Sequence, residues 1–369
     1  MQTSSPKTLA VLVSIFFFTS NLSGTFLTVY YRQELGLSIG EIAVILLFTF
    51  PLIGLLPLLL LRTVKNFERI ISWGIFFTMF FYIILSFIKN PVVLGITYGL
   101  SIATFWPSFN LLQFRLGETK VRARTISLFS SIIPSLASIG GPVVGGFIID
   151  SFEFHALFAV AVALYFIAFF LSLRIRFSQE TCGFSVPRNG KFAVFFVSFV
   201  LLGLTESYWV AYPLFVLGVS GTVLNMGLVL ALSAIVISMV TFLVNWLSDI
   251  KRARVTFAVI GVALNAAWYV ALSFVSTTSE VVALSMISGL GSAFSISWFA
   301  FYGDSFERYS YASILVLMET GLMIGRILNL LPTYMFVSVA DYATYFRLLA
   351  LILLFLIPLY VLMRRISRD

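Results

Sequence analysis

Three ionisable residues lie inside apolar stretches that are long enough to span a bilayer: Glu206, Glu319 and Arg326. Such side chains cost roughly 2.5–3.5 kcal/mol at the centre of a membrane helix on insertion scales, so each is a functional candidate by default. Glu206 and Arg326 each lie about 14 residues into their stretch, which is about 21 Å at 1.5 Å per residue. We therefore predict an ion pair between them near the middle of the membrane.

Glu319 precedes Arg326 by seven positions, which puts it on the same helix face but about 10 Å closer to the helix start. That separation predicts no simple pair between the two. A carboxylate that alternates between water and apolar protein can load and release a proton. We predict Glu206 or Glu319 as the proton-coupling residue, with Arg326 either tuning that carboxylate or binding an anionic substrate. The alternative is a permanently neutralised pair of Glu206 and Arg326 that only fixes packing.

Polar and aromatic side chains recur on the first, fourth, seventh and tenth apolar stretches, where contact with lipid would be unfavourable. For any single Ser or Thr, a bond to the backbone of its own helix is the favoured interpretation. A polar series of this kind in the tenth stretch consists of Ser285, Ser288, Ser292 and Ser295. The stronger candidates for a substrate site are Asn21, Trp106, Asn110, Trp209, Trp298 and Arg326.

The composition is that of a membrane protein. Hydrophobic residues make up 60% of the 369 residues and charged residues 10%, whereas soluble domains have about 45–50% and about 25%. Backbone groups in hydrocarbon must be satisfied within the chain, and these runs are too long for barrel strands, so helices are expected. The predicted fold is all-α and polytopic, with twelve spans near residues 8–31, 41–61, 69–88, 91–114, 125–149, 154–173, 192–217, 224–248, 255–275, 281–302, 312–337 and 343–363.

Basic residues alternate sharply between the two sets of loops. Of 23 Lys and Arg residues, Arg326 lies within a span and only Arg32, Lys89 and Arg347 fall in one set of loops, which leaves 19 for the other set and the termini. By the positive-inside rule we expect a multi-pass protein of the cell membrane with both termini in the cytoplasm. The basic residues form short clusters rather than one stripe, so a nucleic-acid partner is not expected.

The longest polar connection predicts the domain organisation. It separates an N-terminal six-helix bundle, residues 1–177, from a C-terminal six-helix bundle, residues 192–369, with a cytoplasmic linker at 178–191. One cysteine, Cys182, and one histidine, His155, provide no cluster for zinc or haem, so no metal or other cofactor is expected. No Gly-x-x-x-x-Gly-Lys phosphate loop is present, which disfavours ATP-driven pumping.

Two motifs carry a family resemblance. The run Asn245–Arg254 contains a Leu, an Asp and several basic residues, and in these it resembles the cytoplasmic loop motif of the major facilitator superfamily of secondary transporters. The resemblance implies that Asp249 and Arg252 are gating residues. The fifth stretch is similar to the Gly-Pro-x-x-Gly-Gly motif of drug/proton antiporters in that family. Its Gly141 and Gly145 would admit a close helix and its Pro142 favours a kink. The resemblance assigns gating to Gly141, Pro142, Gly145 and Gly146, with ordinary close packing as the alternative.

The resemblance implies two helix bundles that alternate access to a central cavity lined by the first, fourth, seventh and tenth helices. We expect a secondary transporter of a small molecule, proton-coupled, with the antiporter-like motif favouring efflux of an amphipathic or drug-like compound. The alternative is uptake or uniport of a small metabolite such as a sugar or organic anion. A non-transporting membrane sensor is the other class. An enzyme is not expected, because one histidine and scattered carboxylates supply no catalytic cluster. The expected partners are the substrate, a proton or other coupling ion, and the lipid bilayer.

Overall fold

The computed structural model describes residues 6–64, 69–116, 133–175, 184–251, 253–306 and 308–366, and all regular elements in these ranges are helices. In chain order the elements are α1 (Pro6–Ser23), η1 (Gly24–Phe26), α2 (Leu27–Gln33), α3 (Ile39–Thr63), α4 (Ile70–Leu85), α5 (Pro91–Leu116), α7 (Ile133–Leu173), α8 (Gly190–Leu204), η4 (Ser207–Trp209), α9 (Ala211–Ser220), α10 (Val223–Lys251), α11 (Arg254–Leu272), α12 (Thr278–Ser305), α13 (Tyr311–Pro332), η5 (Thr333–Val337), α14 (Tyr342–Leu354) and α15 (Leu356–Ile366).

Within these described ranges, nine helical segments are long and apolar enough to cross a membrane. Two further apolar helices are shorter, Ile70–Leu85 and Val223–Val236. They fall on the predicted third and eighth spans. The all-helical membrane architecture expected from composition is therefore confirmed.

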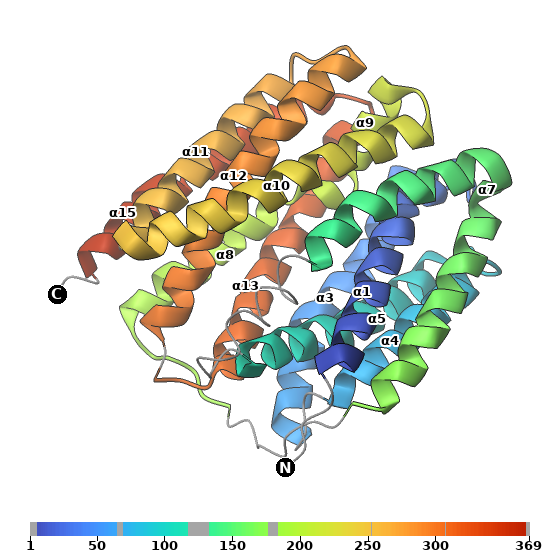
Figure 1. Ribbon diagram of the computed structural model, residues 1–369. Helices are drawn as coiled ribbons and strands as arrows, with labels where there is room; N and C mark the ends of the chain where they lie inside the picture. Colours follow the sequence, from blue (N-terminus) through green and yellow to red (C-terminus); the bar gives the residue numbers. More distant parts are fainter. Residues whose placement is uncertain are drawn as a thin grey trace.

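The long helix α7 reverses direction at one residue. Glu153 has φ 69° and ψ 170°, so two helices meet there, and Figure 1 shows α7 bending sharply at this end of the molecule. A positive φ is uncommon for a residue with a side chain and interrupts the helical hydrogen bonds. The break lies in the gap predicted between residues 149 and 154. Pro142, where a kink was expected, keeps helical dihedral angles.

Polar side chains fix the starts of three helices. Ser38 and Glu41 form a capping box at α3, and Thr277 and Glu280 form another at α12. Asp341 accepts the backbone N–H of Thr344 at the start of α14. These bonds satisfy donors that a helix start leaves unpaired.

Two sets of helices lie against each other (Figure 1), the blue-to-green set from α1 to α7 and the yellow-green-to-red set from α8 to α15. Helix α7 packs on α1 within its own set and on α10 of the other, and α3 packs on α13. These two lines of contact join segments that are far apart in the sequence.

Small residues permit the contacts of α7. A Cβ atom at Gly141 would come within 2.7 Å of Asn21 in α1, and one at Gly145 would overlap the carbonyl oxygen of Leu22. On the other side, a Cβ at Gly146 would meet Leu224 in α10 at 2.9 Å. The predicted contact face of Gly141 and Gly145 is thus confirmed and packs on α1, while the neighbouring Gly146 permits a second contact with α10.

Candidate functional site

The seventh span is discontinuous at the level of its charged residue. Helix α8 ends at Leu204, and Glu206 has non-helical angles, φ −77° and ψ 85°, before η4 and α9 continue the chain. The freed backbone groups find partners, because the Tyr269 hydroxyl donates to the Thr205 carbonyl at 2.6 Å and Asn329 donates to the Glu206 carbonyl at 3.2 Å. Irregular backbone at membrane depth is tolerated where it is satisfied in this way.

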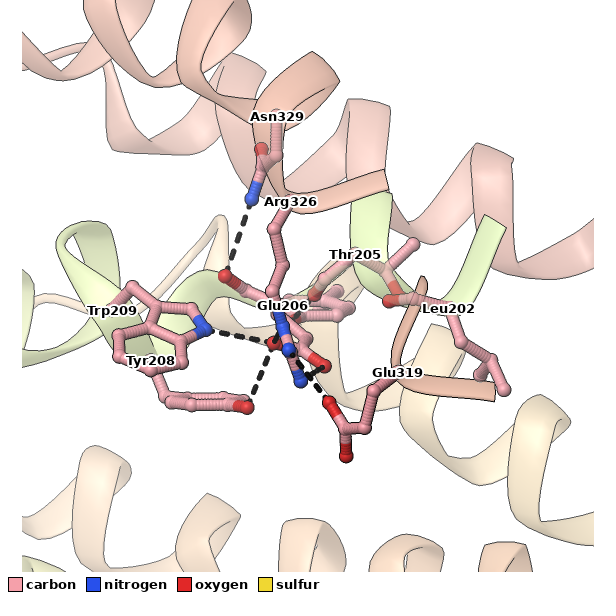
Figure 2. Close-up of polar contacts among 9 residues, drawn as sticks. Leu202, Thr205, Glu206, Tyr208, Trp209, Glu319, Arg326 and Asn329 are labelled. Atoms are coloured by element: carbon pink, nitrogen blue, oxygen red, sulfur yellow. Dashed lines mark hydrogen bonds and ion pairs between the residues drawn. The ribbon is translucent and has the colours of Figure 1, made fainter. Parts of the chain in front are cut away.

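Glu206 and Arg326 form the predicted ion pair. Arg326 Nε lies 2.6 Å from Glu206 Oε2, and its Nη2 lies 3.0 Å from Oε1 (Figure 2). Trp209 Nε1 and the Tyr208 hydroxyl also donate to Glu206 Oε2, at 2.7 and 2.8 Å. The Glu206 carboxylate therefore accepts four hydrogen bonds, two of them in a bidentate, charge-assisted arrangement.

Glu319 joins the same cluster. Arg326 Nη1 lies 3.2 Å from Glu319 Oε2, so the expectation that the two are too far apart to pair was wrong. The reason is side-chain reach: an arginine on a helix extends toward the N-terminus, over the preceding turns. Two long side chains together cross the two turns that separate their Cα atoms.

The cluster of Glu206, Arg326 and Glu319 holds two carboxylates and one guanidinium. All three side chains are mostly buried, with exposures of 14%, 8% and 16% respectively. With every group ionised the cluster has a net charge of −1. An uncompensated charge away from bulk water is unfavourable, so the cluster has a place for one positive charge.

A cavity of ≈ 570 Å³ lies between the two sets of helices and reaches this cluster. Of the predicted site residues, those that line it are Asn21, Trp106, Asn110, Pro142, Trp209, Glu319 and Arg326. Glu206 lies behind Arg326 and lines a separate, smaller pocket.

Sequence reasoning missed much of the cavity's aromatic wall. The additional aromatic lining residues are Phe16, Tyr31, Tyr82, Tyr98, Phe105, Tyr165 and Tyr208. Only Tyr208, two positions after Glu206, carried a signal that proximity to a buried charge could have revealed. The others stand in a sequence with 40 Phe and 15 Tyr, where aromatic type alone does not separate the cavity from the core.

Trp298, which the sequence suggested as a substrate-site residue, does not line this cavity. It is 1% exposed, stacks on Tyr360 with ring centroids 3.7 Å apart, and donates to Ser198 Oγ at 3.1 Å. The tenth span, α12, contributes none of the described lining residues. Two of its serines bond to the backbone of their own helix, because the Ser285 hydroxyl donates to the Val282 carbonyl and the Ser295 hydroxyl donates to the Gly291 carbonyl.

Trp209 connects the two sets of helices. Its carbonyl accepts the Thr28 hydroxyl at 2.7 Å, and its ring meets Phe50 at 5.2 Å and Tyr98 at 6.4 Å between centroids. The guanidinium carbon of Arg326 lies 5.7 Å from the same ring. The Trp209 side chain thus contacts the charge cluster and two residues of the opposite set, Phe50 and Tyr98, while its backbone carbonyl binds a third, Thr28.

The predicted cytoplasmic gate falls outside what the structure describes, since the Asp249 side chain and all of Arg252 lie beyond the described residues. A neighbouring ion pair is described instead. Arg254 Nη1, at the start of α11, pairs with Asp304 Oδ2, near the end of α12. It joins two helices of the same set, and the Asp304 side chain is 60% exposed, so its contribution to stability is small.

The comparisons with known proteins agree on the fold. Two crystal structures of the nucleoside transporter NupG, one of a point variant, superpose on 97% of this chain with TM-scores of 0.75 and 0.71 and sequence identities of 14% and 15%. They cover 99% and 98% of those chains respectively. The chain therefore has the fold of a multi-pass membrane transporter.

At the level of sequence the similarity is narrower. The "uncharacterized protein YqgE" of Bacillus subtilis (strain 168) is 27% identical over 172 residues, which is 42% of this chain and 38% of that protein. The alignment thus spans well under half of the curated relative. No family model matches the sequence.

Proposed function

We propose that the protein is a secondary transporter that takes up a small metabolite by alternating access, with the cavity as its substrate site. The observation that carries this proposal is a cavity between two sets of helices that ends on a buried charge cluster at a helix break. Discontinuous helices at the midplane, between two repeats, are typical of transporter substrate sites.

The topology within this proposal has twelve crossings. The nine candidate spans include α7 from Ile139, which crosses twice because of the reversal at Glu153, and the two shorter apolar helices complete the twelve. We assign six to a bundle at 1–177 and six to a bundle at 192–369, with the linker 178–191 and both termini in the cytoplasm. This assignment keeps the alternation of basic loops expected for a protein of the cell membrane.

Uptake of a metabolite is better supported than efflux of a drug-like compound. The two solved structures compared above are of a nucleoside transporter, and nucleosides are small metabolites. The glycine and proline residues of α7 that favoured efflux are accounted for by contacts with α1 and α10. Their additional role in gating remains part of the proposal, because the contact of α7 with α10 joins the two bundles and must change if they rock.

In this scheme Glu319 is the residue that binds and releases the coupled proton, and Glu206 holds Arg326 in position. Glu206 is held by four hydrogen bonds, whereas Glu319 lines the cavity with Arg326 as its hydrogen-bonding partner among the described residues. A proton on Glu319 would cancel the excess negative charge of the cluster. Movement of that proton with an uncharged solute would bring the transmembrane potential into play as a driving force.

Trp209 is proposed to link the charge cluster to the contact between the bundles. Its indole N–H is bound to Glu206, and its carbonyl is bound to Thr28 of the other bundle. Any shift of the cluster on substrate or proton binding therefore acts on a group that also holds the two bundles together. Loss of these contacts would accompany opening of the cavity on that side.

Flux through reconstituted protein tests the proposal. Purified protein in proteoliposomes is given radiolabelled uridine and, separately, glucose, with the interior more alkaline than the exterior, and uptake is compared with protein-free vesicles. Uptake of at least one solute that collapses with a protonophore supports a proton-coupled transporter. Solute binding without flux would favour the sensor alternative, and flux that ignores the proton gradient would remove the coupling role of Glu319.

A further inference from the structure

The charge of the cavity restricts the charge of its ligand. Glu319 and Arg326 are its only described lining residues that are charged at neutral pH, and Arg326 is already held by Glu206 from behind. An anionic ligand would bring an uncompensated negative charge to a cluster that is neutral when Glu319 is protonated and has a net charge of −1 when Glu319 is ionised. The geometry therefore argues against Arg326 as an anion-binding residue. It also excludes organic anions, one of the substrate classes that the sequence allowed.

Tyr208 presents an aromatic face to the cavity. The residue is 54% exposed and lines the cavity, while its hydroxyl is anchored on Glu206 at 2.8 Å. Its ring centroid lies 5.4 Å from that of Trp209 with 30° between the planes, and Trp209 in turn meets Tyr98. An anchored ring beside two further rings is a platform on which a flat aromatic ligand can stack.

Polar groups without internal partners lie elsewhere on the same cavity. The Tyr31 hydroxyl is buried in a residue that is 3% exposed, and it has no hydrogen-bond partner among the described residues. Asn21 uses its Nδ2 on the Phe17 carbonyl, so its amide oxygen is the group that can accept from a ligand. A ligand with hydroxyl groups can donate to the Asn21 amide oxygen, and it can pair with the Tyr31 hydroxyl, a group normally hydrogen-bonded when buried, once that side chain turns toward the cavity.

From these three observations we infer that the cavity binds a neutral solute with a flat aromatic ring joined to a hydroxyl-bearing part, and that it rejects anions of the same shape. The inference rests on the proposed function in taking this cavity as the substrate site. Uridine is a probe with this chemistry. Uridine 5′-monophosphate is its anionic counterpart, and ribose has the hydroxyl groups without the ring.

Binding to the purified full-length protein tests the inference without requiring flux. The thermal midpoint is measured against increasing concentrations of each probe. Uridine should stabilise the protein at concentrations at least about tenfold lower than either uridine 5′-monophosphate or ribose. If the monophosphate or ribose stabilises as well as uridine, or if none of the three binds, the inference is overturned.

Two variants separate the ring of Tyr208 from its hydroxyl. Tyr208→Leu removes the stacking face and should weaken uridine binding about tenfold, within the range measured for base stacking on aromatic side chains. Tyr208→Phe keeps the face and should retain most of the affinity. The unliganded midpoint of each variant checks its folding, and equal uridine affinity in Tyr208→Leu and the unmodified protein would remove Tyr208 from the site.

The inference and the proposed function fail in different ways. Uridine binding without uptake in proteoliposomes would support the inferred class of ligand and refute the proposal that the protein is a transporter. Glucose uptake without uridine binding would support transport and refute the inferred class of ligand.

Discussion

Replacing the two carboxylates of the charge cluster separately with glutamine should give opposite results in two assays. Glu206→Gln removes the charge that faces Arg326 through two bonds, and it leaves an amide that can accept only part of the four hydrogen bonds. Hydrogen bonds to charged groups contribute about 1.5–3 kcal/mol each, so weakening the four that Glu206 accepts costs about 3–5 kcal/mol, although Glu319 still pairs with Arg326. Glu319→Gln removes one contact of 3.2 Å and leaves a neutral Glu206–Arg326 pair, so its cost is about 1 kcal/mol or less.

The two variants are compared by thermal unfolding in detergent and by solute uptake in proteoliposomes. We expect Glu206→Gln to lower the midpoint by roughly 6–10 °C, taking about 2 °C per kcal/mol for a chain of this size. Glu319→Gln should change it by no more than about 2 °C. In uptake, Glu319→Gln should abolish the response to a proton gradient, whereas any folded fraction of Glu206→Gln should keep it.

Glu319→Asp serves as the matched control, because it keeps the charge with a side chain shorter by one methylene. It should retain a response to the gradient. A large loss of stability in Glu319→Gln together with a silent Glu206→Gln would reverse the roles assigned here. Proton-driven uptake that is unchanged in both variants would refute the reasoning for each of them.

Three further substitutions probe the contacts of the fold. Gly145→Ala places a methyl group against a backbone carbonyl of α1 and should destabilise the protein by about 1–3 kcal/mol, whereas Gly140→Ala, whose Cβ would meet a ring at 3.6 Å, should be neutral or stabilising in the same thermal assay. Thr28→Val removes the hydrogen bond to Trp209, worth about 1 kcal/mol, and should alter the initial rate of uptake while Thr28→Ser does not; equal rates in both would contradict the link between bundles. Accepting a backbone N–H of α14 holds the pKa of the Asp341 carboxyl below its usual range, so the stability it contributes is present above the unfolded pKa of about 3.9 and is lost as pH falls through the folded value. The difference in thermal midpoint between Asp341→Ala and the unmodified protein should therefore be present at neutral pH and vanish in acid; a difference independent of pH would exclude this role.

The sequence by itself determined that the chain is helical and where the membrane-spanning stretches lie, because hydrophobicity and length depend on composition along the chain alone. It also determined the pairing of Glu206 and Arg326. Both residues lie at a similar depth, and a buried charge strongly requires a partner of opposite sign. The small-residue face at Gly141 and Gly145 was likewise readable from spacing of four residues along a helix.

Tertiary structure decided which side chains share the cavity. Depth along a helix does not fix rotation about its axis, so Trp298 resembled a site residue although it packs into the core. The rise per residue gives the distance between Cα atoms and not the reach of the side chains. The sequence therefore predicted that Glu319 and Arg326 are too far apart to pair, although they form an ion pair. The aromatic wall gathers residues from spans distant in sequence, such as Tyr82 and Tyr208. These residues share only the cavity that they face. That cavity forms when the two sets of helices pack together.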